Sequence, residues 1–289
     1  MQFTNVYVIN RACDVVRMKK THNILLKNNI KYTRFPAVTI ETHEDLFKNK
    51  PTCVTDEMYG CGLSHLLIWQ KVITEKLDHV IIFEDDIYLK KNWKSVFKKA
   101  TKSIPKNWDI LTLGNFGIKH KSDMYQSLPF NLIFYMIITF LNLQNKKQEY
   151  KDPYVCIPYF FTGLYGYSVS YKGAKKLLSI FKDPSCINFH IDVLISKNNH
   201  LLNIYSLIDD IVYQRNEQST INKSYVKDNT FKLNLNLFKN DMVDNKNINY
   251  NYYMNVPVLN MLIFNKYNII INGWFILFFI IIMVIIHKY

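Results

Sequence analysis

Short apolar runs and longer amphipathic stretches alternate along the first two thirds of the chain. The short runs predict buried strands, because they are rich in β-branched and aromatic residues and end near Pro, Gly or charged residues. They lie at residues 5–10, 31–38, 79–84, 108–114 and 164–170. Apolar residues at helical spacing predict helices at residues 14–28, 61–77, 92–100 and 174–181. A short helix and a last strand are expected between residues 190 and 214, so we predict an α/β fold with parallel strand pairs.

Three segments depart from this alternation. Residues 116–153 form a predicted insertion, whose apolar part at 130–143 suits a core helix, an interfacial helix or a lid. Residues 215–265 are mostly polar and rich in Asn and Lys, which predicts a loose stalk after a domain at residues 1–214. Residues 266–289 contain the uncharged run 269–286. A buried core helix is one interpretation of this run, but it has no polar face and its length suits a bilayer, so we predict a C-terminal membrane anchor.

The composition limits the possible partners. The 289 residues carry a formal net charge of +13, which favours an anionic partner such as a nucleotide or a phospholipid surface. The lysines are scattered and form no aromatic-interleaved stripe, so nucleic-acid binding rests on charge alone and is not favoured. The five cysteines form no CxxC pair, and this excludes a zinc-finger spacing. The opening residues do not resemble a signal peptide, so the anchored domain is expected to face the cytosol.

Three consecutive acids follow the apolar run of the strand predicted at residues 79–84. Glu84, Asp85 and Asp86 are adjacent in an otherwise basic chain. Like charges this close repel, and their burial is costly unless a cation lies among them. Ligands of open α/β sheets bind beyond the carboxyl ends of strands, and Mg²⁺ or Mn²⁺ prefers one or two carboxylates with phosphate oxygens. The acids therefore predict a metal site for a nucleotide diphosphate, with strand ending and helix capping as the alternative role.

Seven segments in a fixed order resemble the family 25 glycosyltransferases, which include bacterial lipopolysaccharide glycosyltransferases and collagen β-galactosyltransferases. The segments are VYVIN followed by Arg17, YTRFPAV, GCGLSHLLIWQKVI, VIIFEDDI, WDILTLG, GYSVSYKGAKKLL and HIDVLI. Each segment is moderately specific, and their joint occurrence carries the resemblance. It implies a GT-A-like, Rossmann-type mixed sheet flanked by helices, a nucleotide sugar donor, often UDP-galactose, and inversion at the anomeric carbon.

The resemblance also implies roles for individual residues. Glu84 and Asp86 match metal ligands for Mn²⁺ or Mg²⁺, and Asp85 matches the same catalytic motif. The positions that match donor-binding residues are Arg17, Ser64, His65, Glu84, Gly166 and Tyr167. Asp192 matches a late acid and is the candidate general base, with His190 in reserve, because inverting transfer needs a group that takes the proton of the acceptor hydroxyl. Helix capping is the competing role of Asp192, and a core position is the competing role of His65.

Two functions remain open at this stage. The first is a membrane-anchored, metal-dependent, inverting glycosyltransferase that moves a sugar, with galactose as the first candidate, to a hydroxyl of a glycan, lipid or protein. The second is a catalytically degenerate relative that serves as a membrane-anchored binding or scaffold protein. The intact acidic triplet favours the first. Residues 11–13, where the family usually has a Leu and a further Arg, favour the second.

Overall fold

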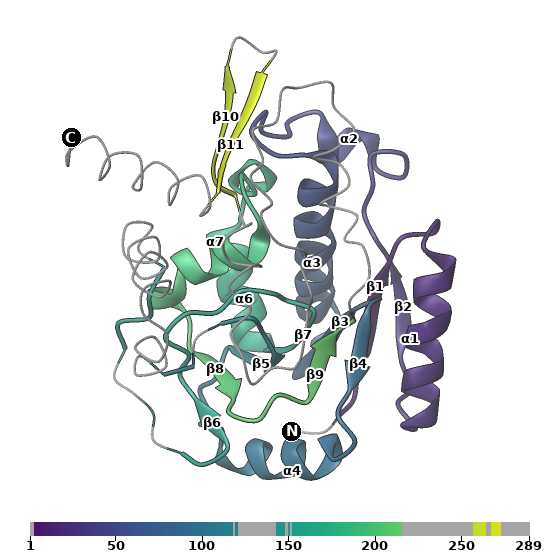
Figure 1. Cartoon of the computed structure of the whole chain (residues 1–289), viewed down its shortest axis with the longest axis vertical. Helices are drawn as coiled ribbons and strands as arrows, with labels where there is room; N and C mark the ends of the chain where they lie inside the picture. Colours follow the sequence, from purple (N-terminus) through teal and green to yellow (C-terminus); the bar gives the residue numbers. More distant parts are fainter. Residues whose placement is uncertain are drawn as a thin grey trace, which may run out of the picture.

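A seven-stranded sheet forms the centre of the computed structural model (Figure 1). The structure describes residues 3–117, 119–120, 143–147, 150, 152–215, 257–263 and 267–272. The strands of the sheet, in spatial order, are β2 (Thr33–Pro36), β1 (Val6–Asn10), β3 (His79–Glu84), β7 (Gly166–Ser170), β5 (Ile110–Gly114), β8 (Ile204–Leu207) and β6 (Val155–Cys156). The pairs β1–β2, β1–β3 and β5–β8 are parallel, whereas β7 and β6 run antiparallel to their neighbours. The sheet is therefore mixed, with most strands pointing the same way.

Helices cover both faces of this sheet. The helices are α1 (Val15–Lys27), α2 (Glu44–Phe47), α3 (Asp56–Thr74), α4 (Trp93–Ser103), α6 (Tyr171–Ile180) and α7 (Ile191–Lys197), with short 3₁₀ turns at Pro184–Cys186 and Asn199–Leu201. Helices α3, α6 and α7 contribute to one apolar cluster, and α1 and α4 contribute to the other. Along β1, Tyr7 and Ile9 belong to the first cluster while Val6 and Val8 belong to the second. Burial on both faces explains why this strand is an apolar run rather than an alternating one.

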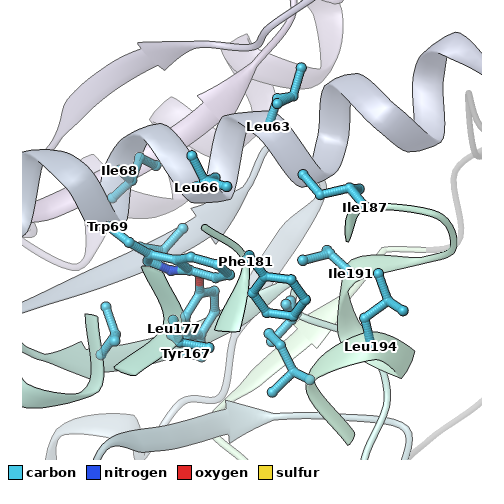
Figure 2. Close-up of a cluster of buried hydrophobic side chains, with 14 of the residues drawn as sticks. Leu63, Leu66, Ile68, Trp69, Tyr167, Leu177, Phe181, Ile187, Ile191 and Leu194 are labelled. Atoms are coloured by element: carbon cyan, nitrogen blue, oxygen red, sulfur yellow. The ribbon is translucent and has the colours of Figure 1, made fainter. Parts of the chain in front are cut away.

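The larger apolar cluster packs α3 against the sheet and against α6 and α7 (Figure 2). Trp69 on α3 is fully buried and stacks at a tilt on Phe181, with ring centroids 6.0 Å apart. Leu177 on α6 and Ile191 on α7 join the same cluster. A helix is thus confirmed where residues 61–77 predicted one, although Gln70 of its predicted apolar face is exposed. Helix α3 runs from Asp56 to Thr74, and Thr55 caps its start by accepting a bond from the Met58 amide.

A small ribbon lies beside the acidic strand end. It pairs β4 (Ile87–Leu89) with β9 (Val212–Gln214) in antiparallel register. The sequence pattern predicted one last strand before residue 214, whereas the structure has two, β8 and β9. This second strand matters for function because its end, Gln214, meets the residues that follow β3.

The prediction for the C-terminal region needs correction. Strands β10 (Pro257–Ile263) and β11 (Tyr267–Asn272) form an antiparallel hairpin within the segments predicted as stalk and as anchor helix. Residues 267–272 are therefore strand rather than part of the predicted helix. No helix among the described residues is long and apolar enough to cross a membrane. Residues 273–289, like the apolar stretch 130–142 of the insertion, lie outside the described residues.

Candidate functional site

A pocket of about 200 Å³ lies beyond the carboxyl ends of β1, β2 and β3. Its lining comes from the ends of these strands, the loops that follow them and one face of α3. The chain passes from β1 to β2 on one side and later returns to β3 on the other side of β1. At such a switch point the connecting helices diverge to opposite faces and leave a crevice for a ligand. The sheet topology thus accounts for the position of the pocket.

This pocket brings together most of the site residues predicted from sequence. Those that line it are Arg17, Ser64, His65, Glu84, Asp85 and Asp86. Those that do not are Gly166, Tyr167, His190 and Asp192. The structure also places Asn10, Arg11, Asp14, Cys61 and Gln214 in the lining.

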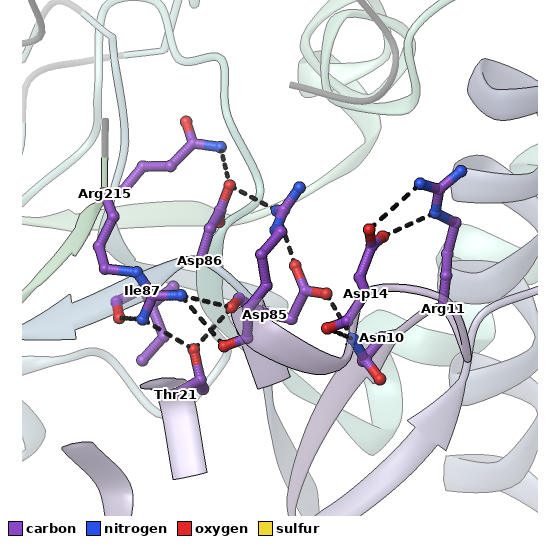
Figure 3. A network of polar contacts seen from close by, with 10 residues as sticks. Asn10, Arg11, Asp14, Thr21, Asp85, Asp86, Ile87 and Arg215 are labelled. Atoms are coloured by element: carbon purple, nitrogen blue, oxygen red, sulfur yellow. Dashed lines mark hydrogen bonds and ion pairs between the residues drawn. The ribbon is translucent and has the colours of Figure 1, made fainter. Parts of the chain in front are cut away.

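The cation among the acids is Arg17, which α1 places over the end of β3. Its Nη2 lies 2.6 Å from Asp85 Oδ1 and 2.7 Å from Asp86 Oδ2. Asn10 donates to the other oxygen of Asp85 over 2.6 Å, and Gln214 donates to Asp86 Oδ2 over 2.9 Å. Figure 3 shows Asp85 and Asp86 at the centre of this network. The two aspartates are 5% and 2% exposed, so their charges require such partners inside the protein.

Burial dominates the electrostatics of the acids. It raises the pKa of Glu84 to about 8, and the neighbouring charge of Asp86 adds to the effect. Burial also raises the pKa of Asp86 to about 6, although the positive charge of Arg17 opposes this shift. Glu84 is therefore largely protonated at neutral pH, and a cation bound beside it would favour its carboxylate form.

Arg215 completes the site, and the sequence interpretation missed it. Its Nη2 donates to the Asp85 carbonyl over 2.8 Å and its Nη1 donates to the Ile87 carbonyl over 2.9 Å. Thr21 on α1 also donates to the Asp85 carbonyl, over 2.6 Å. These bonds fix the turn that carries the acids. Arg215 therefore belongs to the domain rather than to the predicted stalk, and no local sequence signal indicates this because the contact arises only when β9 pairs with β4.

His65 is held at the floor of the pocket by a chain of hydrogen bonds. Its Nδ1 lies 2.9 Å from the Tyr167 hydroxyl, which accepts a bond from the Trp69 indole N–H over 3.0 Å. Burial lowers the pKa of His65 to about 4, so the ring is neutral at physiological pH. Its Nε2 is buried and has no hydrogen-bond partner among the described residues. The imidazole thus presents one nitrogen to Tyr167 and keeps the other available.

The predicted donor contacts of Gly166 and Tyr167 need correction. Tyr167 is fully buried beneath His65 and does not reach the pocket. Gly166 is buried in β7, and a Cβ there would lie 2.6 Å from Cγ1 of Val212. Both residues belong to β7, the strand next to β3, and both have packing roles. Tyr167 orients His65, and Gly166 leaves room for β9 to approach the sheet.

Ser64 lines the pocket, but its hydroxyl is already occupied. It accepts a bond from the Val38 amide over 2.8 Å and donates to the Gly60 carbonyl over 2.7 Å. A Cβ at Gly60 would lie 2.3 Å from the Val38 carbonyl oxygen, so this helical position requires glycine. Gly60 and Ser64 together hold the loop after β2 against α3 and so shape one wall of the pocket.

Asp192 has a role that the sequence interpretation did not consider. Its Oδ2 accepts bonds from the Gly163 amide, over 2.6 Å, and from the Thr162 hydroxyl. Asp192 thus ties the loop before β7 to the first turn of α7, whose N-cap is His190 and not Asp192. His190 makes no side-chain cap bond and packs edge-on against Phe189. The assignment of Asp192 or His190 as general base stays a prediction.

The acidic triplet fits a divalent ion in part. Both carboxylate oxygens of Asp85 already have a partner, Arg17 for one and Asn10 for the other. Oδ1 of Asp86, in contrast, is buried without a hydrogen-bond partner among the described residues. Glu84 lines the same pocket, and burial raises its pKa to about 8 although the charge of Arg17 opposes the shift. The chemistry of Glu84 and Asp86 Oδ1 therefore suits Mn²⁺ or Mg²⁺.

Comparison with known proteins identifies relatives of this chain. The family model described as "Glycosyltransferase family 25 (LPS biosynthesis protein)" matches residues 3–195. A "Putative glycosyltransferase" of Haemophilus influenzae is 30% identical over 100 residues, which is 32% of this chain and 36% of the relative. A "Probable inactive glycosyltransferase 25 family member 3" of Bos taurus is 36% identical over 74 residues, 24% of this chain and 12% of the relative. "Procollagen galactosyltransferase 2" of Mus musculus is 23% identical over 148 residues, 47% of this chain and 18% of the relative. The chain thus aligns with about a third or less of the length of these curated relatives.

The raised pKa of Glu84 generates a prediction on stability. An unfolded Glu titrates near pH 4.3, whereas folded Glu84 has a pKa of about 8. The folded state therefore binds the proton more tightly, and this stabilisation, complete below the unfolded pKa, is lost as the pH rises through the folded value. Glu84→Gln cannot ionise, so we expect its melting temperature to exceed that of the wild type at about pH 8 by more than at about pH 5. Thermal unfolding in EDTA would measure this difference.

The exposed Glu44 provides the matched control. Glu44→Gln removes the same charge away from the pocket and should leave the pH dependence of melting close to that of the wild type. Parallel melting-temperature curves for wild type and Glu84→Gln across this pH range would contradict the assignment of Glu84 as an acid that is protonated at neutral pH.

Proposed function

The chain belongs to glycosyltransferase family 25, and on that basis we propose that it moves a sugar, with inversion, from a nucleotide-diphosphate donor to a hydroxyl of a glycan, lipid or protein. The observation that carries the proposal is the pocket at the switch point, where Arg17, Glu84 and Asp86 meet within the matched region. A GT-A-like arrangement is part of the proposal. UDP-galactose is the first donor to test, because one relative is named a galactosyltransferase.

The polar groups of the pocket suit a diphosphate. Arg17 and Arg11 supply positive charge on the side of α1, and Arg11 is held by a 2.7 Å ion pair to Asp14. Glu84 and Asp86 would hold Mn²⁺ or Mg²⁺, which neutralises the leaving diphosphate when it is bound. Asp85 keeps Arg17 in place, and the neutral His65 ring closes the floor without adding charge.

The alternative, a degenerate relative that binds without catalysis, rests on two observations. Residues 11–13 depart from the family pattern, and one relative is named inactive. The retained acids and Arg17 favour catalysis instead. A direct measurement of nucleoside diphosphate released from a panel of nucleotide sugars, with Mn²⁺ present, separates the two proposals.

We also propose that apolar residues 273–286 attach the chain to a membrane, with the catalytic domain facing the cytosol. The support is the uncharged composition of this run, which suits contact with lipid. The full chain should sediment with membranes after alkaline carbonate washing, and a chain that ends at residue 272 should not. Equal recovery of both chains in the supernatant would contradict the attachment.

The proposed donor site predicts a loss of turnover in Asp86→Asn. The amide keeps the shape of the carboxyl group but removes the charge that would bind the metal, so donor turnover should fall on the order of 10²-fold or more. The exposed Asp45→Asn is the control and should retain wild-type turnover. Full turnover in Asp86→Asn would contradict the site, whereas full turnover in EDTA would contradict only the metal dependence.

Asp192→Asn tests the general base. The structure favours an anchoring role, because an amide cannot accept every bond that the carboxylate of Asp192 accepts from Thr162, Gly163 and the Val193 amide. We therefore expect a loss of about 1–3 kcal/mol in the free energy of unfolding, with normal donor turnover at temperatures where the variant is folded. Turnover lowered on the order of 10²–10⁴-fold at unchanged stability and donor affinity would instead identify Asp192 as the base.

A further inference from the structure

A second group of potential metal ligands in the pocket shares Glu84 with the acidic triplet. Helix α3 presents Cys61 and His65 on one face, because they are four residues apart, and β3 ends at Glu84, which lines the pocket with them. One ligand atom from each of these three residues lies within 4.8 Å of the others. We propose that Cys61, His65 and Glu84 form a binding site for one Zn²⁺ ion, with the fourth coordination position open to the pocket.

The unpartnered nitrogen of His65 is the observation that points to a ligand. His65 is fully buried, and its Nε2 has no hydrogen-bond partner among the described residues. Buried polar side-chain atoms normally have a hydrogen-bond partner, so the lack of one at Nε2 requires an explanation. The other ring nitrogen is fixed by Tyr167, which is fixed in turn by Trp69. In metal-binding histidines, a hydrogen bond to the ring nitrogen that does not bind the metal fixes the direction of the nitrogen that does.

The ligand types select the metal. A thiolate and an imidazole favour Zn²⁺ over Mg²⁺ or Mn²⁺, which prefer oxygen ligands alone. Three protein ligands and one open position are the usual arrangement of zinc sites that bind a further molecule. The ligand atoms of a tetrahedral site lie about 3.3–3.8 Å apart, given zinc–ligand bonds of about 2.0–2.3 Å. Small side-chain rotations therefore suffice to close the observed 4.8 Å cluster around one ion.

Binding of Zn²⁺ to this site is balanced in charge and in protons. Zn²⁺ displaces the proton of the Cys61 thiol and the proton of the Glu84 carboxyl group into solvent, and the thiolate and carboxylate neutralise the ion. His65 stays neutral and carries its one proton on Nδ1, which then donates to the Tyr167 oxygen. That oxygen has two lone pairs, so it can accept from Trp69 and His65 together.

This site shares Glu84 with the proposed Mn²⁺ or Mg²⁺ site, but its test does not depend on the proposed transfer reaction. Mn²⁺ or Mg²⁺ at Glu84 and Asp86 would be bound by oxygen atoms alone, whereas the second site includes a sulfur ligand. A spectroscopic signal from the sulfur therefore reports the second site whether or not the protein transfers sugar.

Cobalt titration of the purified full chain tests the proposal. Co²⁺ replaces Zn²⁺ in tetrahedral sites and gives a thiolate-to-metal charge-transfer band in the near ultraviolet together with visible bands of tetrahedral cobalt. We expect both to saturate at one Co²⁺ per chain and to disappear when Zn²⁺ is added. Absence of the charge-transfer band at saturating Co²⁺ would overturn the proposal.

Variants assign the ligands. Cys61→Ser keeps the size of the side chain and should abolish the charge-transfer band, whereas Cys186→Ser, another partly buried cysteine, should retain it. Tyr167→Phe removes the group that orients His65 and should weaken Zn²⁺ binding about 10–100-fold in chelator competition. Asp86→Asn should leave the band in place. Circular dichroism confirms that each variant is folded, and His65→Gln repeats the test if Cys61→Ser is not. An unchanged band in folded Cys61→Ser, or unchanged Zn²⁺ affinity in folded His65→Gln, would overturn the site.

Discussion

The buried ion pair between Arg17 and the two aspartates is the interaction on which the rest of the site depends. Asp85 and Asp86 are almost wholly inaccessible, so their charges are tolerable only with a partner inside the protein. Arg17 comes from the helix after β1, and the aspartates follow β3, so the pair joins the ends of two neighbouring parallel strands. The pocket keeps its shape because separating these elements would leave buried charges without compensation.

The backbone of the acidic turn is held as firmly as its side chains. The Asp85 carbonyl accepts bonds from Thr21 and from Arg215, residues that lie 194 positions apart in the chain. Because residues from both ends of the domain donate hydrogen bonds to its backbone, this turn does not need a ligand to order it. The carboxyl group of Glu84 is the exception, because it lines the pocket without an equivalent partner among the described residues, so a cation bound there would favour its ionised form.

Local pattern predicted the strands and helices of the domain well, because burial on both faces of the sheet leaves continuous apolar runs and the helices keep one apolar face. The family resemblance, rather than local pattern, assigned Arg17, His65 and the acids to one site, and all of them line one pocket in the structure. Local pattern could not give the direction of each side chain. Tyr167 packs beneath His65, and Asp192 binds Thr162, because these contacts depend on how β7 and α7 pack. Arg215 was missed for the same reason. Strand β11 was mistaken for part of a helix, because β-branched, apolar residues suit both, and β10 was mistaken for stalk.

Glu84 connects the two proposed metal sites, and this sharing has a thermodynamic consequence. A carboxylate drawn toward Zn²⁺ at Cys61 and His65 is less available to Mn²⁺ or Mg²⁺ beside Asp86, and two cations this close also repel each other. Each ion must therefore weaken the binding of the other by the same factor, because coupling between two binding equilibria is reciprocal. A carboxylate that bridged both ions would reduce this antagonism, since each of its oxygens could serve one of them. The size of this antagonism thus depends on whether the two oxygens of one side chain, fixed at the end of β3, can point to both sites at once.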